Sequence, residues 1–285
     1  MFGQLLSSLT DGLLLGFVYG LAAMGLSLIW GVMTVINLAH GPVIALGMFT
    51  AYLLFTQAGV NPYLALLPVA VLGMVMGLVI YGVAVHRVLN APHLSTLLAT
   101  FAVNMIIIGV GTAVFTTSPH NIDYSLGSFS AGPLTVPFTR VVAALAAMAA
   151  TALLYLFLYF TRPGKAIRAV ANNRMAAELM GISSTTMLAL SFGLGTLLAC
   201  LAGGLIATFF PFTILSGGPY ELKSFVICVL GGLGNPLGAL LGGLLLGGLE
   251  GLVPAFMPVS WVPVVEFGLF VLVLLVRPQG LLGAK

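Results

Sequence analysis

Residues 162–182 read RPGKAIRAVANNRMAAELMGI and form the one sizeable polar, basic segment in a chain of 285 residues. About a third of the charged side chains lie here: Arg162, Lys165, Arg168, Arg174 and Glu178. The sequence on either side is almost entirely apolar. A polar element of this size between two apolar runs needs a reason to exist, and we expect a protein on one side of a membrane to bind it.

The composition excludes a water-soluble protein. Hydrophobic residues make up 60% of the chain and charged residues only 5%, whereas a soluble domain carries about 25% charged residues. The 36 glycines are typical of packed membrane helices, in which small residues let two backbones approach. Lipid is therefore the expected solvent of this chain.

Apolar runs long enough to cross a bilayer, which needs about 20 residues, recur along the chain. They are continuous and do not alternate like barrel strands, so helices are expected. We predict an all-α integral membrane protein, one transmembrane domain over residues 1–285, with about eight transmembrane helices and a possible half-helix at 222–233. The predicted spans are 9–31, 40–58, 62–87, 93–115, 138–160, 186–212, 236–257 and 259–276.

The basic residues orient these spans, because cytoplasmic loops carry an excess of Lys and Arg. A cytoplasmic segment at 161–185 places seven of the nine basic residues on one face and the N-terminus outside. Residues 116–137 then form an external loop, either a docking surface for a soluble partner or a mere connector. The seven residues are Arg87, Arg162, Lys165, Arg168, Arg174, Arg277 and Lys285.

Two polar breaks interrupt the apolar runs, VINLAHGP at 35–42 and GGLGNP at 231–236. Interrupted helices in both halves of a chain are a known pointer to a transport path, although packing alone explains such a bend as well. Ionisable and amide side chains inside spans are costly unless paired or wetted. The candidates for the path or its gate are Asn37, His40, Gly41, Asn104 and Glu250; for His40 a capping hydrogen bond, and for Glu250 exposure at the interface, are the alternatives.

Glycines recur every four residues in three ladders. These are Gly12, Gly16 and Gly20; Gly234, Gly238 and Gly242; and Gly243, Gly247 and Gly251. Such ladders predict close helix packing, within the subunit or against a partner.

Enzyme signatures are missing. The chain has no GxxxxGK[ST] phosphate loop, GxGxxG, nucleophile elbow or HExxH motif. Its four histidines lack metal-ligand spacing, and Cys200 and Cys228 lie in apolar runs that predict buried thiols. We therefore expect no enzymatic activity of its own, no bound cofactor, no metal and no nucleic-acid partner.

The polar segment itself predicts one or two short amphipathic helices. Pro163 suits a first helical turn and Gly181 suits a C′ stop. Its small alanines bury little area in lipid, so a groove on another protein fits better than a membrane surface.

Four segments together resemble the permease subunits of branched-chain amino acid uptake systems, a branch of the ABC importers. They are GLSLIWGVMTVINLAHGPVIALGMFTAYL (25–53), GKAIRAVANNRMAAELMGI (164–182), GGLGNPLGALLGGLLLGGLE (231–250) and VRPQGLLG (276–283). Within the second, Ala176, Ala177, Glu178 and Gly181 resemble a degenerate form of the EAA-and-glycine signature in the coupling loop of ABC importer permeases. The resemblance implies a coupling contact made by Gly164, Lys165, Arg168, Arg174, Ala177, Glu178 and Gly181.

The resemblance further implies a bacterial inner-membrane importer that works by alternating access. Its partners are a second homologous permease, two ATP-binding subunits that use ATP and Mg²⁺, and a periplasmic or extracellular solute-binding protein. Members of the branch carry branched-chain and other amino acids, urea or short amides. The rival interpretations are a stand-alone secondary carrier or channel, which would transport without ATP, and a membrane scaffold.

Overall fold

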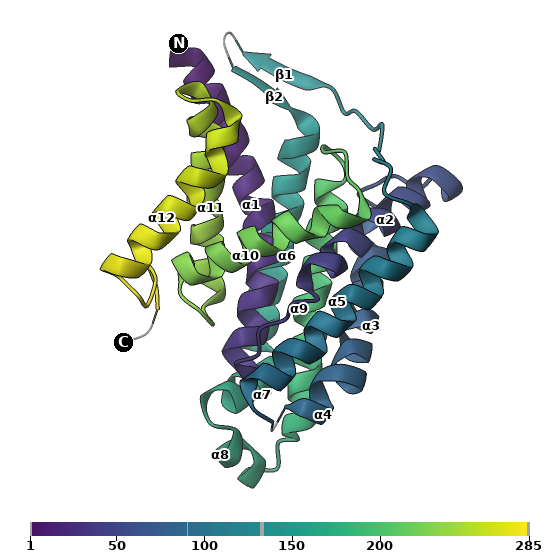
Figure 1. The fold of residues 1–285 in the computed structure, drawn as a ribbon, viewed down its shortest axis with the longest axis vertical. Coiled ribbons are helices and arrows are strands. Elements are labelled where there is room, and N and C mark those ends of the chain that lie inside the picture. Colours follow the sequence, from purple (N-terminus) through teal and green to yellow (C-terminus); the bar gives the residue numbers. More distant parts are fainter. Residues whose placement is uncertain (1, 90, 132–133, 284–285) are drawn as a thin grey trace.

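The computed structural model describes residues 2–89, 91–131 and 134–283. Helices account for most of this part of the chain (Figure 1). Short 3₁₀ turns occupy Ile214–Ser216, Val253–Ala255 and Val259–Trp261, and a two-stranded hairpin is formed by β1 (Ser128–Ala131) and β2 (Leu134–Pro137). The helices are α1 (Phe2–Met33), α2 (His40–Ala58), α3 (Leu66–Ile80), α4 (His86–Val88, continuing α3 through a π-helical turn at Tyr81–Val85), α5 (His93–Phe115), α6 (Phe138–Phe160), α7 (Arg162–Asn172), α8 (Arg174–Leu179), α9 (Ser184–Ile206), α10 (Gly217–Gly231), α11 (Pro236–Leu252) and α12 (Val262–Val276).

Eight helical segments within the described residues are long and apolar enough to cross a membrane, which confirms the predicted fold class. Each coincides with a predicted span to within a few residues. The half-helix predicted at 222–233 is the second part of α10, which begins five residues earlier. The sequence Gly217-Gly218-Pro219 looks like a break, but glycine and proline are both tolerated in a first helical turn.

Helix α1 is the centre of the molecule. About four fifths of its apolar span is buried inside the protein (83%), against 11% for α12. It lies between α11, α9, α10 and α6, while α5 and α12 lie at the outside (Figure 1). The side chains of the outer helices are apolar and exposed, as expected where lipid is the solvent.

Glycines bring α1 and α11 into backbone contact. A Cβ atom built on Gly31 would lie 2.9 Å from Cα of Gly234, and one on Gly12 would lie 2.9 Å from Cα of Gly251. On the other side of α11, Gly242 faces Ile227 of α10, as Gly238 faces Gly231. The glycine ladders therefore pack helices within this subunit.

The two thiols are buried, and each donates to a carbonyl of another helix. Cys228 Sγ lies 2.9 Å from the Ala23 oxygen, and Cys200 Sγ lies 3.2 Å from the Val43 oxygen. Neither cysteine forms a disulfide.

The C-terminal segment folds back onto the end of α10. The amides of Leu281 and Leu282 donate to the carbonyls of Leu230 and Gly231, at 2.8 and 3.1 Å. The side-chain amide of Asn235 donates to the Leu282 carbonyl at 3.0 Å. The tail therefore satisfies carbonyls at the C-terminal end of α10 that would otherwise lack an intrahelical partner.

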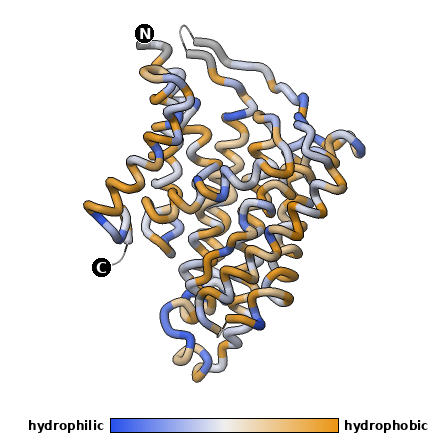
Figure 2. Tube along the Cα trace, viewed as in Figure 1, coloured by the Kyte–Doolittle hydropathy of each residue, from blue (hydrophilic) through white to orange (hydrophobic). Residues whose placement is uncertain are grey.

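The two ends of the molecule are polar and differ from each other (Figure 2). At one end lie the N-terminal part of α1 and the β1–β2 hairpin, so the 116–137 segment contains a β element in addition to irregular chain. A backbone bridge joins His120 to Phe212 there, and Arg140 forms an ion pair with Asp11 at 2.6 Å.

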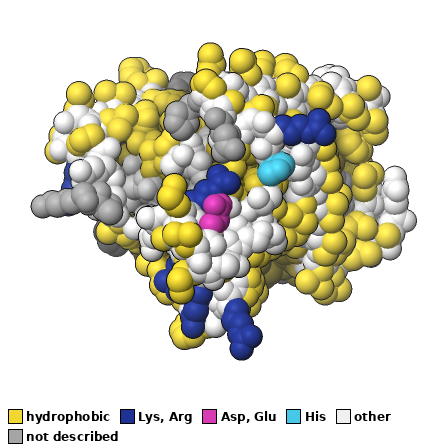
Figure 3. Space-filling model, turned by 90° about the horizontal axis from the view of Figure 1, so that it is seen from below, with side chains coloured by type: hydrophobic (Ala, Val, Ile, Leu, Met, Phe, Trp, Pro, Cys, Tyr) yellow, Lys and Arg dark blue, Asp and Glu magenta, His cyan; other side chains and the backbone are white. Residues whose placement is uncertain are grey.

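At the opposite end lie α4, α7 and α8, with the C-terminal end of α12 facing the same way. Viewed from below, this face shows scattered basic side chains and little acidic surface (Figure 3). The positive-inside rule makes it the cytoplasmic face. Of the seven basic residues assigned to it from the sequence, Lys285 lies outside the described residues.

Candidate functional site

Helix α7 begins with a complete N-terminal cap. The Thr161 hydroxyl accepts a hydrogen bond from the Gly164 amide at 3.1 Å, and Pro163 occupies the first turn. The helix buries Gly164, Ile167 and Val170, which lie three residues apart on one face. A Cβ on Gly164 would lie 2.6 Å from Cα of Leu158. Only glycine allows this close approach between α7 and the end of α6.

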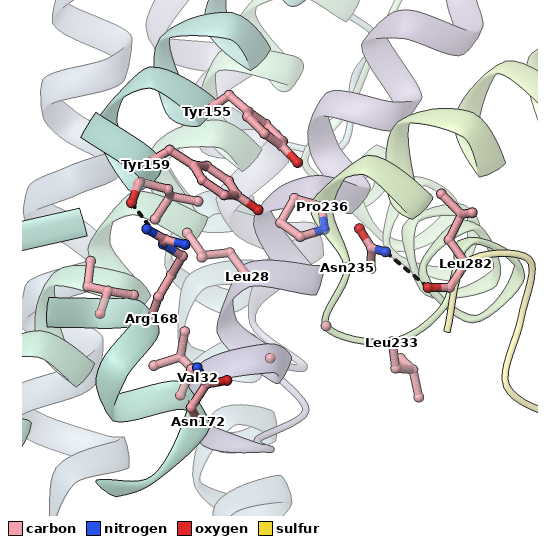
Figure 4. Close-up of a pocket in the computed structure, with 15 residues that line it drawn as sticks. Leu28, Val32, Tyr155, Tyr159, Arg168, Asn172, Leu233, Asn235, Pro236 and Leu282 are labelled. Atoms are coloured by element: carbon pink, nitrogen blue, oxygen red, sulfur yellow. Dashed lines mark hydrogen bonds between the residues drawn. The ribbon is translucent and has the colours of Figure 1, made fainter. Parts of the chain in front are cut away.

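Arg168 fixes α7 to α6 from the other side. Its Nε donates to the Leu158 carbonyl at 3.1 Å, and its guanidinium lies over the Tyr159 ring, 4.2 Å from the centroid (Figure 4). The bond satisfies a carbonyl at the C-terminal end of α6. The arrangement makes α7 a rigid continuation of a spanning helix.

A cavity of about 480 Å³ lies beside this contact. Tyr155, Tyr159 and Arg168 line one wall, and the loop between α10 and α11, with Asn235 and Pro236, lines the other (Figure 4). The cavity therefore separates the α6–α7 corner from the second of the two predicted breaks.

Helix α8 is short and capped at both ends. The Asn173 side chain accepts from the Ala176 amide at 3.0 Å. At the C-terminal end Gly181 has a φ of +81°, and the Ile182 amide donates to Ala177 at 3.0 Å. This left-handed backbone conformation explains why a glycine occupies position 181, and it confirms the predicted end of the helix at Gly181.

The outward face of α8 is apolar. Met175 is 74% exposed, Leu179 84% and Met180 83%, while Ala177 is the buried residue of the helix. Exposed apolar side chains at a water-facing end of a membrane protein mark a surface for another protein. Sequence reasoning missed Met175 and Leu179, although their alternation with charged residues was visible.

Glu178 joins α8 to the start of α9. It accepts from Arg174 Nε at 3.2 Å and from the hydroxyl of Ser184. The Ser184 hydrogen bond, followed by the Arg174 guanidinium, lowers the pKa of the Glu178 carboxyl from its ordinary value. The predicted coupling residues thus lie at one end of the molecule, with Lys165 exposed among them.

The first break, residues 34–39, is satisfied by side chains of α5. Asn104 donates to the Leu38 carbonyl at 2.6 Å, and Thr100 accepts from the Leu38 amide at 3.2 Å. Asn37 accepts from the Ala39 amide at 3.1 Å. These bonds replace the helical ladder that the break interrupts.

His40 and Gly41 lie deep in the protein. His40 Nε2 lies 3.0 Å from the Ala22 carbonyl of α1, and Gly41 packs against Gly217 and Glu221 of α10. The exposed fraction is 1% for Asn37 and 0% for His40. In this conformation the break is packed inside the subunit, so its role as a path or gate stays a prediction.

Glu250 lies in a different place from these residues. Its carboxylate pairs with Lys223 of α10 at 2.7 Å and accepts from the Tyr19 hydroxyl at 3.4 Å. Lys223 also lies 3.6 Å from Glu266 of α12. The sequence gave no sign of this cluster. No group of three or more metal-ligating side chains was found in the described part of the chain.

The fold and these sites define a polytopic α-helical membrane protein, with a capped helical element fixed to its basic end. The chain belongs to the family described as branched-chain amino acid transport system / permease component, which it matches over residues 8–274. It is accordingly a multi-pass protein of the inner (plasma) membrane.

Curated relatives cover nearly the whole chain. The branched-chain amino acid permease LivH of Salmonella typhimurium and that of Escherichia coli K12 are each 31% identical to it, over 98% of this chain and 95% of theirs. BraD of Pseudomonas aeruginosa is 30% identical over the same shares. The ribose import permease RbsC of Escherichia coli is 31% identical over 75% of this chain and 68% of its own. No solved structure shows significant similarity to the chain.

Proposed function

We propose that this chain is the permease subunit of an ATP-driven importer for branched-chain or related amino acids. The near full-length similarity to LivH and BraD supports the substrate class. The family description as one component of a transport system supports partners. We assign it a second permease of related fold, two ATP-binding subunits that hold ATP and Mg²⁺, and an external solute-binding protein.

The exposed apolar face of α8 carries the assignment of the ATP-binding partner. Met175, Leu179 and Met180 extend from a helix whose own packing residue is Ala177. They lie at the basic end of the molecule beside the Arg174–Glu178 pair. These protruding apolar side chains suit insertion into a groove of a second protein.

The rigid α6–α7 corner gives this contact a mechanical consequence. Gly164 and Arg168 hold α7 against the end of α6, so a displacement of α7–α8 by the ATP-binding subunits moves α6 with it. Closure of those subunits then biases the permease pair between two arrangements, and the path opens in turn to each side.

Co-purification tests the proposal. The double variant Met175→Ser/Leu179→Ser should insert in the membrane but lose the ATP-binding subunits during purification. Phe256→Ser is the matched control, because Phe256 is 68% exposed at the opposite end. Retention of the ATP-binding subunits by the double variant at the wild-type ratio would contradict the assignment of α8.

A further inference from the structure

Lys223 lies between two glutamates that come from the two helices following α10. Its Nζ is 2.7 Å from Glu250 Oε2 and 3.6 Å from Glu266 Oε1. The three side chains are 21%, 24% and 5% exposed. The cluster therefore joins α10, α11 and α12 at a partly buried position.

The cluster holds two carboxyl groups and one ammonium group. No other basic side chain in the described residues forms an ion pair with either carboxyl group. Glu266 Oε1 is buried and accepts no hydrogen bond. Ionisable groups inside a membrane protein are costly, and they mark a candidate functional site by default.

An open pocket of about 360 Å³ gives access to the cluster. Lys223 and Glu250 lie on its wall together with three aromatic rings, Tyr19, Tyr220 and Phe210. The ring of Tyr19 lies 4.9 Å from the Lys223 ammonium and 6.0 Å from the ring of Tyr220. Aromatic faces attract cations, and the volume suits a small solute.

The next cavity along α1 and α10 is almost closed. Leu26, Trp30, Phe225 and Cys228 enclose a space of only about 10 Å³. Leu233, at the second break, also lines this apolar cavity, which is far smaller than the polar pocket.

A second ion pair, between Arg140 and Asp11, serves as a comparison for the Lys223 cluster. Arg140 and Asp11 join α6 to α1 at 2.6 Å, with exposed fractions of 22% and 27%. The distance and the exposed fractions match those of Lys223 and Glu250, but here one basic side chain pairs with one acidic side chain. The Lys223 cluster instead combines a second carboxyl group with an aromatic pocket.

We propose that this pocket binds the charged ends of a transported α-amino acid, with Glu250 accepting the ammonium and Lys223 holding the carboxylate. Glu266 keeps Lys223 paired when Glu250 turns to the ligand. Because the ligand competes with an existing ion pair, binding is weak, as a path that must release its solute requires. The inference rests on the proposed function and adds contact residues for its substrate.

The test uses the reconstituted complete importer with its solute-binding protein and L-leucine as the probe. Glu250→Gln and Lys223→Gln should lower the initial rate of leucine uptake about ten-fold or more, as for the loss of one charge-assisted hydrogen bond. ATP hydrolysis should still respond to the loaded binding protein. Glu250→Asp should recover part of the uptake, and Asp11→Asn, the matched ion-pair control, should keep it.

Other outcomes overturn the inference. If Glu250→Gln and Asp11→Asn lose uptake and assembled complex to the same extent, the cluster only stabilises the fold and does not bind the solute. A wild-type requirement for Na⁺ that disappears in Glu250→Gln would make it a site for an inorganic cation. If Glu250→Gln and Lys223→Gln both take up leucine at the wild-type rate, the proposed binding site is contradicted but the proposed function is not. If the wild-type importer shows no ATP-dependent leucine uptake, the proposed function itself is contradicted.

Discussion

Arg168 donates a hydrogen bond to the carbonyl of Leu158, 3.1 Å away and ten residues earlier in the chain. The bond closes the corner between the last turn of α6 and the first two turns of α7, and Tyr159 covers the guanidinium. A polar segment that the sequence marks as a binding element is thereby fixed to a spanning helix.

The first prediction concerns this corner. Arg168→Ala should leave the complex assembled but weaken the stimulation of ATP hydrolysis by loaded binding protein, because α7 can then move without α6. Arg162→Ala is the control, since Arg162 is exposed on the same helix and is not among the predicted coupling residues. We would measure ATPase activity in proteoliposomes; wild-type stimulation in Arg168→Ala would show that the corner does not transmit movement.

The contact between α1 and α11 gives the second prediction. A Cβ on Gly247 would lie 2.5 Å from Cα of Gly16, so Gly247→Leu must separate the two backbones. Overpacking typically costs about 1–3 kcal/mol. Size exclusion should show a reduced yield of folded complex for this variant. Gly109→Leu, on α5 where a Cβ meets nothing within 4 Å, should behave as the wild type, and an equal yield from both variants would contradict the packing role.

Asn104 provides the third prediction. Asn104→Asp keeps the shape of the side chain but removes the donor that pairs with the Leu38 carbonyl. An unsatisfied buried carbonyl costs about 1–3 kcal/mol, so the melting temperature in detergent should fall. Asn121→Asp is a surface control, because Asn121 is exposed in the 116–137 segment. An unchanged melting temperature in Asn104→Asp would mean that water satisfies the break.

The same break can be probed with a thiol reagent. Asn37→Cys, with Cys200 and Cys228 replaced, should be inert without nucleotide, because Asn37 is buried. A path or gate at 35–42 requires the reaction to accelerate when ATP is trapped. Inertness in both states would leave the break a structural element only.

Glu178 gives a pH dependence. Its pKa is lower in the folded chain than the ordinary value of 4.5, so the carboxylate stabilises the α8–α9 junction above that ordinary value. The contribution is lost as the pH falls through the lowered pKa. Amide protection factors across residues 174–184, corrected for intrinsic exchange, should therefore fall on acidification from pH 5 toward pH 3. In Glu178→Gln this fall should disappear; an identical pH profile in both proteins would remove Glu178 as the cause.

Much of the fold could be predicted because hydropathy alone determines where a chain crosses lipid. The eight spans follow from apolar runs of sufficient length, and the stop at Gly181 follows from helix-capping chemistry. The start of α10 was harder to predict, because Gly217 and Pro219 are typical of a break between helices. The hairpin within 116–137 was missed because its alternating runs, SFSA and LTVP, are only four residues long each.

The arrangement of the sites depended on contacts between distant residues. Lys223 meets Glu250 and Glu266 across 27 and 43 positions, and no local pattern reports such a pairing. Asn37, His40 and Asn104 were singled out as costly polar residues inside spans. Only the tertiary structure shows that their side chains bond to the backbone of Ala39, Ala22 and Leu38 respectively. Glu250 was predicted to line the path together with these residues, but it lies apart from them and pairs with Lys223.

ATP-dependent uptake by the reconstituted system tests the central claim most directly. Proteoliposomes would contain this permease with its second permease and ATP-binding subunits, with solute-binding protein and radiolabelled leucine outside and ATP inside. The account predicts leucine accumulation that requires ATP hydrolysis and the binding protein, and none with this chain alone. Transport by the purified chain alone, without ATP, would contradict it and establish a stand-alone carrier or channel.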